Sequence, residues 1–212
     1  MNASFLPFVF VLVIGLPLLG TAAQWAALRF ARVPVTSVSV FNGSPITTFT
    51  IFGTTITIGC IPTGSSVAFD IPVFRSRSLL TRLAVILSGP AALLVFAVVL
   101  LSLPQALSHF ISGFFQLVVG AIHPRTTAIE FITRLHTVFS SSASTASGII
   151  AAKLAALALL PLGGMAAAES VRQFLGSFGE HGVVTAFLTI SALVAILLSI
   201  LWLLAIFFYV SN

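Results

Sequence analysis

The chain has 212 residues, of which 58% are hydrophobic and only 6% are charged. Soluble domains carry roughly 25% charged residues, so this composition excludes an ordinary soluble globular domain. The net charge of +5 comes from scattered basic residues without a continuous basic face, which argues against a nucleic-acid partner. Cys60 is the only cysteine, which excludes an intrachain disulfide and a cysteine-based metal cluster. We therefore expect an integral membrane protein in contact with the lipid bilayer.

Four apolar stretches are long enough to cross a hydrocarbon core of about 30 Å, which takes about 20 helical residues. They cover residues 3–30, 81–103, 149–168 and 183–210. The first has no basic segment before it and continues past the length of a signal peptide, so we expect an uncleaved span. The predicted fold class is an all-α polytopic membrane protein with about four transmembrane helices, forming one membrane domain over residues 1–212.

Residues 33–74 have a different composition, rich in Thr, Ile, Val and Phe. Asn42-Gly43 and Gly53 interrupt the run, and several apolar and polar positions alternate, which is typical of strands joined by turns. We expect a small membrane-associated β-sheet between the first two spans, at or slightly inside the membrane surface.

Two segments between the second and third spans need other interpretations. Residues 105–122 are apolar but short and contain Ser108, His109 and Gln116, so an interfacial or re-entrant helix is favoured over a full span. Residues 124–148 begin with apolar positions at helical spacing, which predicts a short amphipathic outer helix. The Ser, Ala and Thr residues from 140 to 148 predict a flexible connector.

The basic residues give an orientation, because five arginines flank the loop between the first two spans: Arg29, Arg32, Arg75, Arg77 and Arg82. Positively charged loops stay in the cytoplasm, so we expect the 31–80 loop inside and the N-terminus outside, in a bacterial inner membrane. Asp70 is expected to pair with Arg75 or Arg77.

Three ordered pieces of the chain resemble the site-2 protease family of intramembrane zinc proteases. "RSLLTRLAVILSGPAALLVFAVVLL" (77–101) resembles the family's second core helix, with its Gly-Pro step at Ser88-Gly89-Pro90. "IPTGSSVAF" (61–69) is similar to a segment of the family's membrane-associated sheet, through Pro62 and Gly64. "LALLPLGGMAAAESVRQF" (157–174) is similar to the helix that carries the family's Leu-Asp-Gly motif, and Pro161 aligns the two.

The resemblance implies a His-Glu-x-x-His motif on the first helix, whose two imidazoles bind zinc from one helix face while the carboxylate activates water. It places this motif at Gly20-Thr21-Ala22-Ala23-Gln24 and the third ligand at Ala166. None of these positions has a zinc ligand or a catalytic carboxylate. The resemblance therefore implies a pseudoprotease, with no catalytic residue, metal or cofactor.

Other catalytic arrangements are weaker. Ser88 and Lys153 would form a serine–lysine dyad only if Lys153 faced the bundle, whereas a lysine near the start of a span ordinarily extends to the interface. A metal site made from His109, His123, His136 and Glu130 has no compact ligand spacing. A protease with rearranged ligands and a small transporter or channel subunit remain alternatives, although the chain has no internal repeat that would favour transport.

Small residues in the third span permit close helix packing, either with a partner or within the bundle: Ala151, Ala155, Gly163, Gly164 and Ala167. A sheet edge also permits pairing with an extended peptide. We expect a structural or regulatory subunit that binds other integral membrane proteins in a hetero-oligomeric complex.

Overall fold

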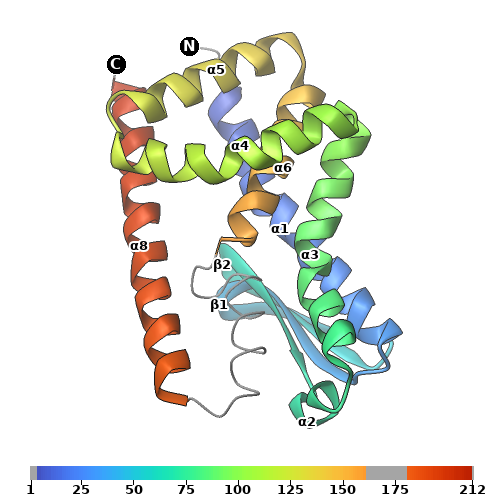
Figure 1. Ribbon diagram of the computed structural model, residues 1–212. Helices are drawn as coiled ribbons and strands as arrows, with labels where there is room; N and C mark the ends of the chain where they lie inside the picture. Colours follow the sequence, from blue (N-terminus) through green and yellow to red (C-terminus); the bar gives the residue numbers. More distant parts are fainter. Residues whose placement is uncertain (1–3, 161–180, 212) are drawn as a thin grey trace. The chain divides into compact units, whose positions relative to one another are not determined.

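The computed structural model describes residues 4–160 and 181–211, and the described part is mostly helical. Four of its helices are long and apolar enough to cross a membrane. They are α1 (Phe5–Phe30), α3 (Leu79–Leu101), α4 (Leu103–Ile122) and residues Thr189–Ser211 of α8 (His181–Ser211). A small antiparallel sheet follows α1 (Figure 1). The predicted fold class is confirmed.

The chain divides into two compact units, with the boundary inside α3. The sheet unit comprises Leu6–Leu93 and contains most of α1, the sheet, α2 and the first part of α3. The helical unit comprises Met1–Phe5 and Leu94–Asn212 and contains the end of α3 with α4, α5, α6 and α8. Each unit has its own set of buried side chains and is described by itself.

In the sheet unit, α1 ends where the chain turns sharply into the first strand. Arg32 has a positive φ of 54°, and the amide of Val33 donates to the carbonyl oxygen of Leu28 at 2.9 Å, which closes the last turn of the helix. Arg77 donates from Nη2 to the carbonyl oxygen of Arg32 at 2.8 Å. The start of α3 is thereby fastened to the end of α1.

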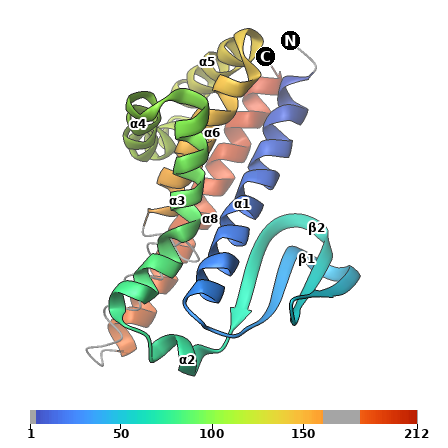
Figure 2. The ribbon, with the colours of Figure 1, turned by 90° about the vertical axis from the view of Figure 1, so that its right-hand side faces the viewer.

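The sheet consists of two long strands, β1 (Val35–Ile51) and β2 (Thr54–Phe69). Phe52 and Gly53 form the turn, and both have positive φ, as a two-residue hairpin turn of type I′ requires. The curled hairpin lies beside α1 (Figure 2). Asn42-Gly43, which the sequence marks as a turn, lies inside β1 at a register shift, where Gly43 has a φ of 86°. A β-bulge explains this glycine, because its left-handed backbone bends the strand without ending it.

Asp70 has a different role from the predicted ion pair with Arg75 or Arg77. Its carboxylate accepts a hydrogen bond from the amide of Val73 at 2.9 Å and caps the short helix α2 (Ile71–Arg75). A carboxylate at an N-cap satisfies a backbone donor that has no partner within the helix, which competes well with an exposed ion pair. Within the described ranges, the salt bridge that forms joins Glu130 to Arg134 on α5 (Thr127–Ser141).

The helical unit contains two helices that lie crosswise to α8. Figure 1 shows α5 above α4, with α8 descending past both, and Figure 2 gives the same arrangement after a quarter turn. α6 (Ala143–Ala158) packs against α4 through a surface of small residues. Gly148 of α6 packs equally closely against the end of α3, because a Cβ there would lie 2.6 Å from the side chain of Leu101.

Three sequence-based boundaries change in this unit. The predicted connector at 140–148 is helical: α5 continues to Ser141 and α6 begins at Ala143, with Ser142 as an N-cap that accepts from the amide of Thr145 at 3.2 Å. The span predicted at 149–168 is helical to Ala158, and residues 161–168 lie outside the described residues. The segment predicted at 105–122 is a 20-residue helix that begins at Leu103, and its membrane placement stays a prediction.

Candidate functional site

Gly20, where the resemblance places the first position of the zinc motif, lies at the contact between α1 and α3. A Cβ built on Gly20 would lie 3.5 Å from the Cα of Gly89, and one built on Gly89 would lie 3.3 Å from the carbonyl oxygen of Gly20. The two helix backbones therefore approach directly, which only small residues permit. Gly89 belongs to the Ser88-Gly89-Pro90 step, and the Ser88 hydroxyl donates to the carbonyl oxygen of Val85 at 2.6 Å. This step therefore serves helix packing.

The second motif position, Thr21, is bonded to the sheet. Its hydroxyl is within hydrogen-bond distance of the Ser65 hydroxyl on β2, and it also approaches the carbonyl oxygen of Pro17 at 3.1 Å. One turn later, Trp25 donates from Nε1 to the hydroxyl of Thr54 at 3.4 Å, and Thr54 is fully buried. This face of α1 thus contacts the sheet through three polar side chains and the Trp25 ring.

The residues at the aligned motif positions do not fit a zinc ion. Zinc in proteins is bound by cysteine, histidine or carboxylate side chains, and α1 contains none of them between Phe5 and Phe30. The side chain of Gln24 is partly buried, but a side-chain amide is a poor zinc ligand. A histidine at residue 20 would direct its side chain against the backbone of Gly89. Ala166 and Pro161 lie outside the described residues. No chemical step through zinc follows from these residues.

A cavity of about 260 Å³ lies beside this face of α1, towards the N-terminus. Its lining is almost wholly apolar and comes from one face of α1 and from both strands: Phe10, Val13, Ile14, Pro17, Leu18, Phe41 and Gly64. Phe41 and Gly64 both have positive φ, of 70° and 69°. A Cβ on Gly64 would lie only 3.1 Å from the side-chain nitrogen Nδ2 of Asn42. Glycine therefore suits this position, both because its φ is positive and because a side chain would be crowded. Pro62, the other residue of this segment, lies within β2.

The small residues proposed for helix packing are buried inside the helical unit. Ala151 and Ala155 have no exposed surface, which favours packing within the unit over a partner surface. Gly163, Gly164 and Ala167 lie outside the described residues. Lys153, between the two alanines, donates to the side-chain oxygen of Gln116 on α4. Lys153 is therefore engaged with α4, and Ser88 with its own helix, which leaves the serine–lysine dyad without support.

His136, one of the histidines of the alternative metal site, is likewise used in packing. His136 stacks on Phe5 with ring centroids 4.6 Å apart, and its Nδ1 lies 2.9 Å from the hydroxyl of Tyr209. Among residues 4–160 and 181–211, no group of three or more His, Cys, Asp or Glu side chains is placed to hold a metal ion. The site of His109, His123, His136 and Glu130 is not assembled in this part of the chain.

Sequence reasoning missed the polar partners of α1 on the sheet. Thr21 and Ser65 are 44 residues apart, and Trp25 and Thr54 are 29 apart, so no local pattern connects them. The available signal was the i, i+4 spacing of Thr21 and Trp25, which places both side chains on one helix face.

The comparison with known families agrees with the fold and with the three resembling segments. The family model for peptidase family M50 matches residues 24–208, which is most of the chain. A comparison of the chain with curated proteins found no match. The matched range includes the sheet, the Ser88-Gly89-Pro90 step and the segment around Pro161. The chain therefore belongs to peptidase family M50, the site-2 protease family.

Proposed function

We propose that this chain is a non-catalytic member of its family and acts as a structural or regulatory subunit that binds another integral membrane protein. One observation carries the proposal: the α1 face aligned with the zinc motif is occupied by packing contacts. Gly20 contacts the backbone of Gly89, and Thr21 bonds to Ser65. A helix face used in this way holds the sheet unit together and presents no ligand to a metal.

The cavity beside this face is the proposed place of contact with the partner. It is apolar, and it combines residues from one face of α1 with Phe41 and Gly64 of the sheet. Pro17 has no amide hydrogen, so the carbonyl oxygen of Val13 in the cavity wall lacks its usual helical donor. A partner's membrane segment that inserts an apolar side chain here would bury apolar surface, and a nearby donor would satisfy that carbonyl.

The proposal predicts that filling the cavity breaks the complex. Ile14→Trp places a large ring in the cavity wall, whereas Val11→Trp adds the same ring to a neighbouring position of α1 that is 65% exposed and does not line the cavity. Native mass spectrometry of the tagged chain, purified in mild detergent, should show a heteromeric mass for wild type and Val11→Trp. Ile14→Trp should run at the mass of the chain alone, with its thermal unfolding midpoint unchanged.

Zinc content of the same samples tests the non-catalytic half of the proposal. We expect far less than one zinc per chain, and Gln24→Ala should change stability or assembly only. Stoichiometric zinc, lost on chelation together with a proteolytic activity, would favour the protease with rearranged ligands. A wild-type chain that is found only at its own mass would instead contradict the subunit role. The non-catalytic claim and the subunit claim can therefore be refuted independently.

A further inference from the structure

The surface of α4 is divided lengthwise into three parts of different chemistry. Small residues face α6 and α8, and polar side chains follow a second line at helical spacing, Gln105, Ser108, Ser112 and Gln116. The third line is a stripe of exposed apolar side chains that are between 38% and 71% exposed: Leu103, Leu107, Ile111, Phe115, Val119 and Ile122. We call this third line the α4 stripe.

α4 is fastened to its own unit along the small-residue side. A Cβ on Gly113 would lie 3.0 Å from the Cβ of Ala156, and one on Gly120 would lie 2.7 Å from the Trp202 ring. Trp202 also donates from Nε1 to the carbonyl oxygen of Leu117 at 2.9 Å. With the bond from Lys153 to Gln116, these contacts hold α4 at the level of Trp202 along α8.

The connection from α3 does not let α4 return as an antiparallel span. A single residue, Ser102, separates Leu101 at the end of α3 from Leu103 at the start of α4. Helical hairpins ordinarily need loops of about 2–5 residues. Ser102 has a φ of 88°, which turns the chain abruptly, and Figure 1 shows α4 leaving this corner crosswise to α8.

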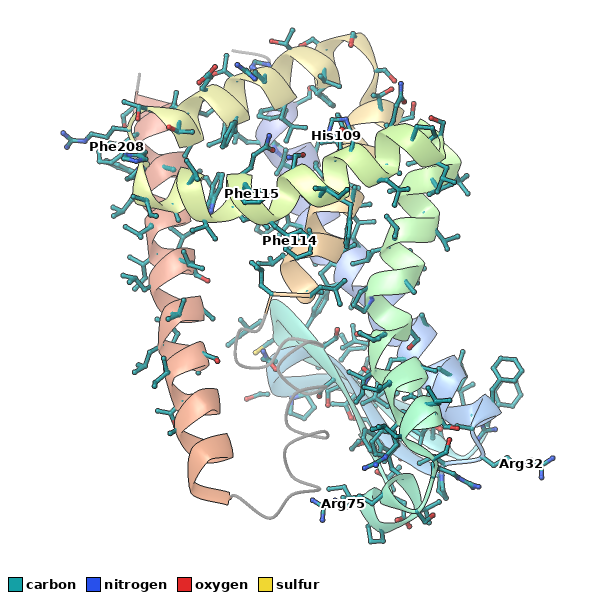
Figure 3. The ribbon with its side chains drawn as sticks, viewed as in Figure 1. Arg32, Arg75, His109, Phe114, Phe115 and Phe208 are labelled. Atoms are coloured by element: carbon teal, nitrogen blue, oxygen red, sulfur yellow. The ribbon has the colours of Figure 1, made fainter. Side chains whose placement is uncertain are left out.

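The side chains of α4 point in directions that suit a bilayer. Figure 3 shows His109 on the side of α4 that faces α5, and Phe114 on the opposite side, away from α5. α5 has exposed Glu130 and Arg134, side chains that require water. α8 has 31 residues, about 46 Å at 1.5 Å per residue, so it can cross a core of about 30 Å and still extend beside α4 and α5.

From these observations we propose that α4 lies in the plane of the bilayer, beneath α5, with the α4 stripe in contact with lipid acyl chains. The stripe is long, continuous and free of polar groups, which matches hydrocarbon and offers no hydrogen bond to a partner. The polar line lies towards the aqueous side. Trp202, an amphipathic ring of the kind enriched at membrane interfaces, fixes the depth of the helix.

Two residues of the stripe distinguish an in-plane helix from a spanning one. Ile111 and Ile122 are 58% and 61% exposed, lie on the same side of the helix, and are 11 residues apart, a separation of about 16 Å along the helix axis. Each is replaced by cysteine and spin-labelled in the full chain with Cys60→Ser, reconstituted in phosphatidylcholine and phosphatidylglycerol. Bilayer depth is measured from collisions with oxygen and with a water-soluble nickel chelate.

An in-plane α4 gives equal depths for the two labels, within a few ångströms, and a shallower depth for a label at Gln105 on the polar line. Depths that differ by about 16 Å would overturn the proposal in favour of a spanning helix. A second pair, Leu107 and Ile122, guards against a local effect of the label at Ile111. Labels that collide with oxygen after reconstitution but not in native membranes would also overturn it, because a protein would then cover the stripe.

Discussion

At the scale of single residues, the informative positions are those where the resemblance predicts a zinc motif and the structure has a packing contact. The resemblance places a histidine at Gly20, and a Cβ there would already lie in van der Waals contact with the α3 backbone, which leaves no room for a larger side chain. A glycine in a helix interior costs roughly 1 kcal/mol relative to alanine. This cost is offset here because the close approach brings the two helices of the sheet unit together.

Gly20→Leu should therefore destabilise the protein, and Gly15→Leu should not. A Cβ on Gly15 would have no atom within 4 Å, although both glycines lie in the same helix. Overpacking typically costs about 1–3 kcal/mol, so the unfolding midpoint of Gly20→Leu should fall while that of Gly15→Leu stays level or rises. Thermal unfolding in detergent measures both. Equal midpoints would mean that the contact between Gly20 and Gly89 does not stabilise the fold.

The residues around this contact were only partly predictable from the sequence. Gly20, Thr21 and Gln24 were found because the family pattern marks their positions and because no zinc ligand occurs on α1. Ser65 and Thr54 were missed, since a hydroxyl in a strand gives no local sign of its partner. The bond between Lys153 and Gln116 was missed for the same reason, with 37 residues between them.

At the scale of elements, the corner between α3 and α4 is the strained point of the helical unit. Ser102 has a φ of 88° and a ψ of 157°, a region that is essentially reserved for glycine. A non-glycine residue held there costs about 1–3 kcal/mol. The contacts of α4 with α6 and α8 must offset this cost for the corner to persist.

Ser102→Gly should therefore stabilise the protein by about 1 kcal/mol, since it relieves the strained backbone. The matched control is Ser108→Gly, six residues later in the helical interior of α4, where glycine should cost about 1 kcal/mol through its lower helix propensity. The two variants should thus shift the thermal unfolding midpoint in opposite directions. A fall for both would show that Ser102 is not strained.

Elements with a clear pattern were predicted well. The composition of residues 33–74 predicted strands, and Gly53 marked the hairpin turn. Residues 140–148 were read as a flexible connector because Ser, Ala and Thr are common in linkers, yet Ser142 caps a helix there. Small residues suit a tightly packed helix as well as a linker, and the contact between Gly148 and Leu101 that decides between them is not local.

At the scale of the whole molecule, the distribution of charge predicts an orientation in the membrane. Five of the nine basic residues lie at the end of α1, in α2 and at the start of α3, all within the sheet unit: Arg29, Arg32, Arg75, Arg77 and Arg82. Asp70, the acidic residue among them, caps α2. The excess of positive charge at this end of the sheet unit predicts that the sheet faces the cytoplasm.

Cys60 tests this orientation directly, because it is the only cysteine and is exposed on β2. A membrane-impermeant maleimide should label the wild-type chain in inside-out vesicles and leave it unlabelled in right-side-out vesicles, while detergent should make both samples react.

Thr137→Cys in a Cys60→Ser background gives the opposite probe, since Thr137 is exposed on α5. It should react only from outside. Because the two probes lie in different units, the reverse pattern for both would invert the whole orientation. Labelling of both from one side would instead mean that the number of crossings between β2 and α5 is even, and that α4 crosses the bilayer.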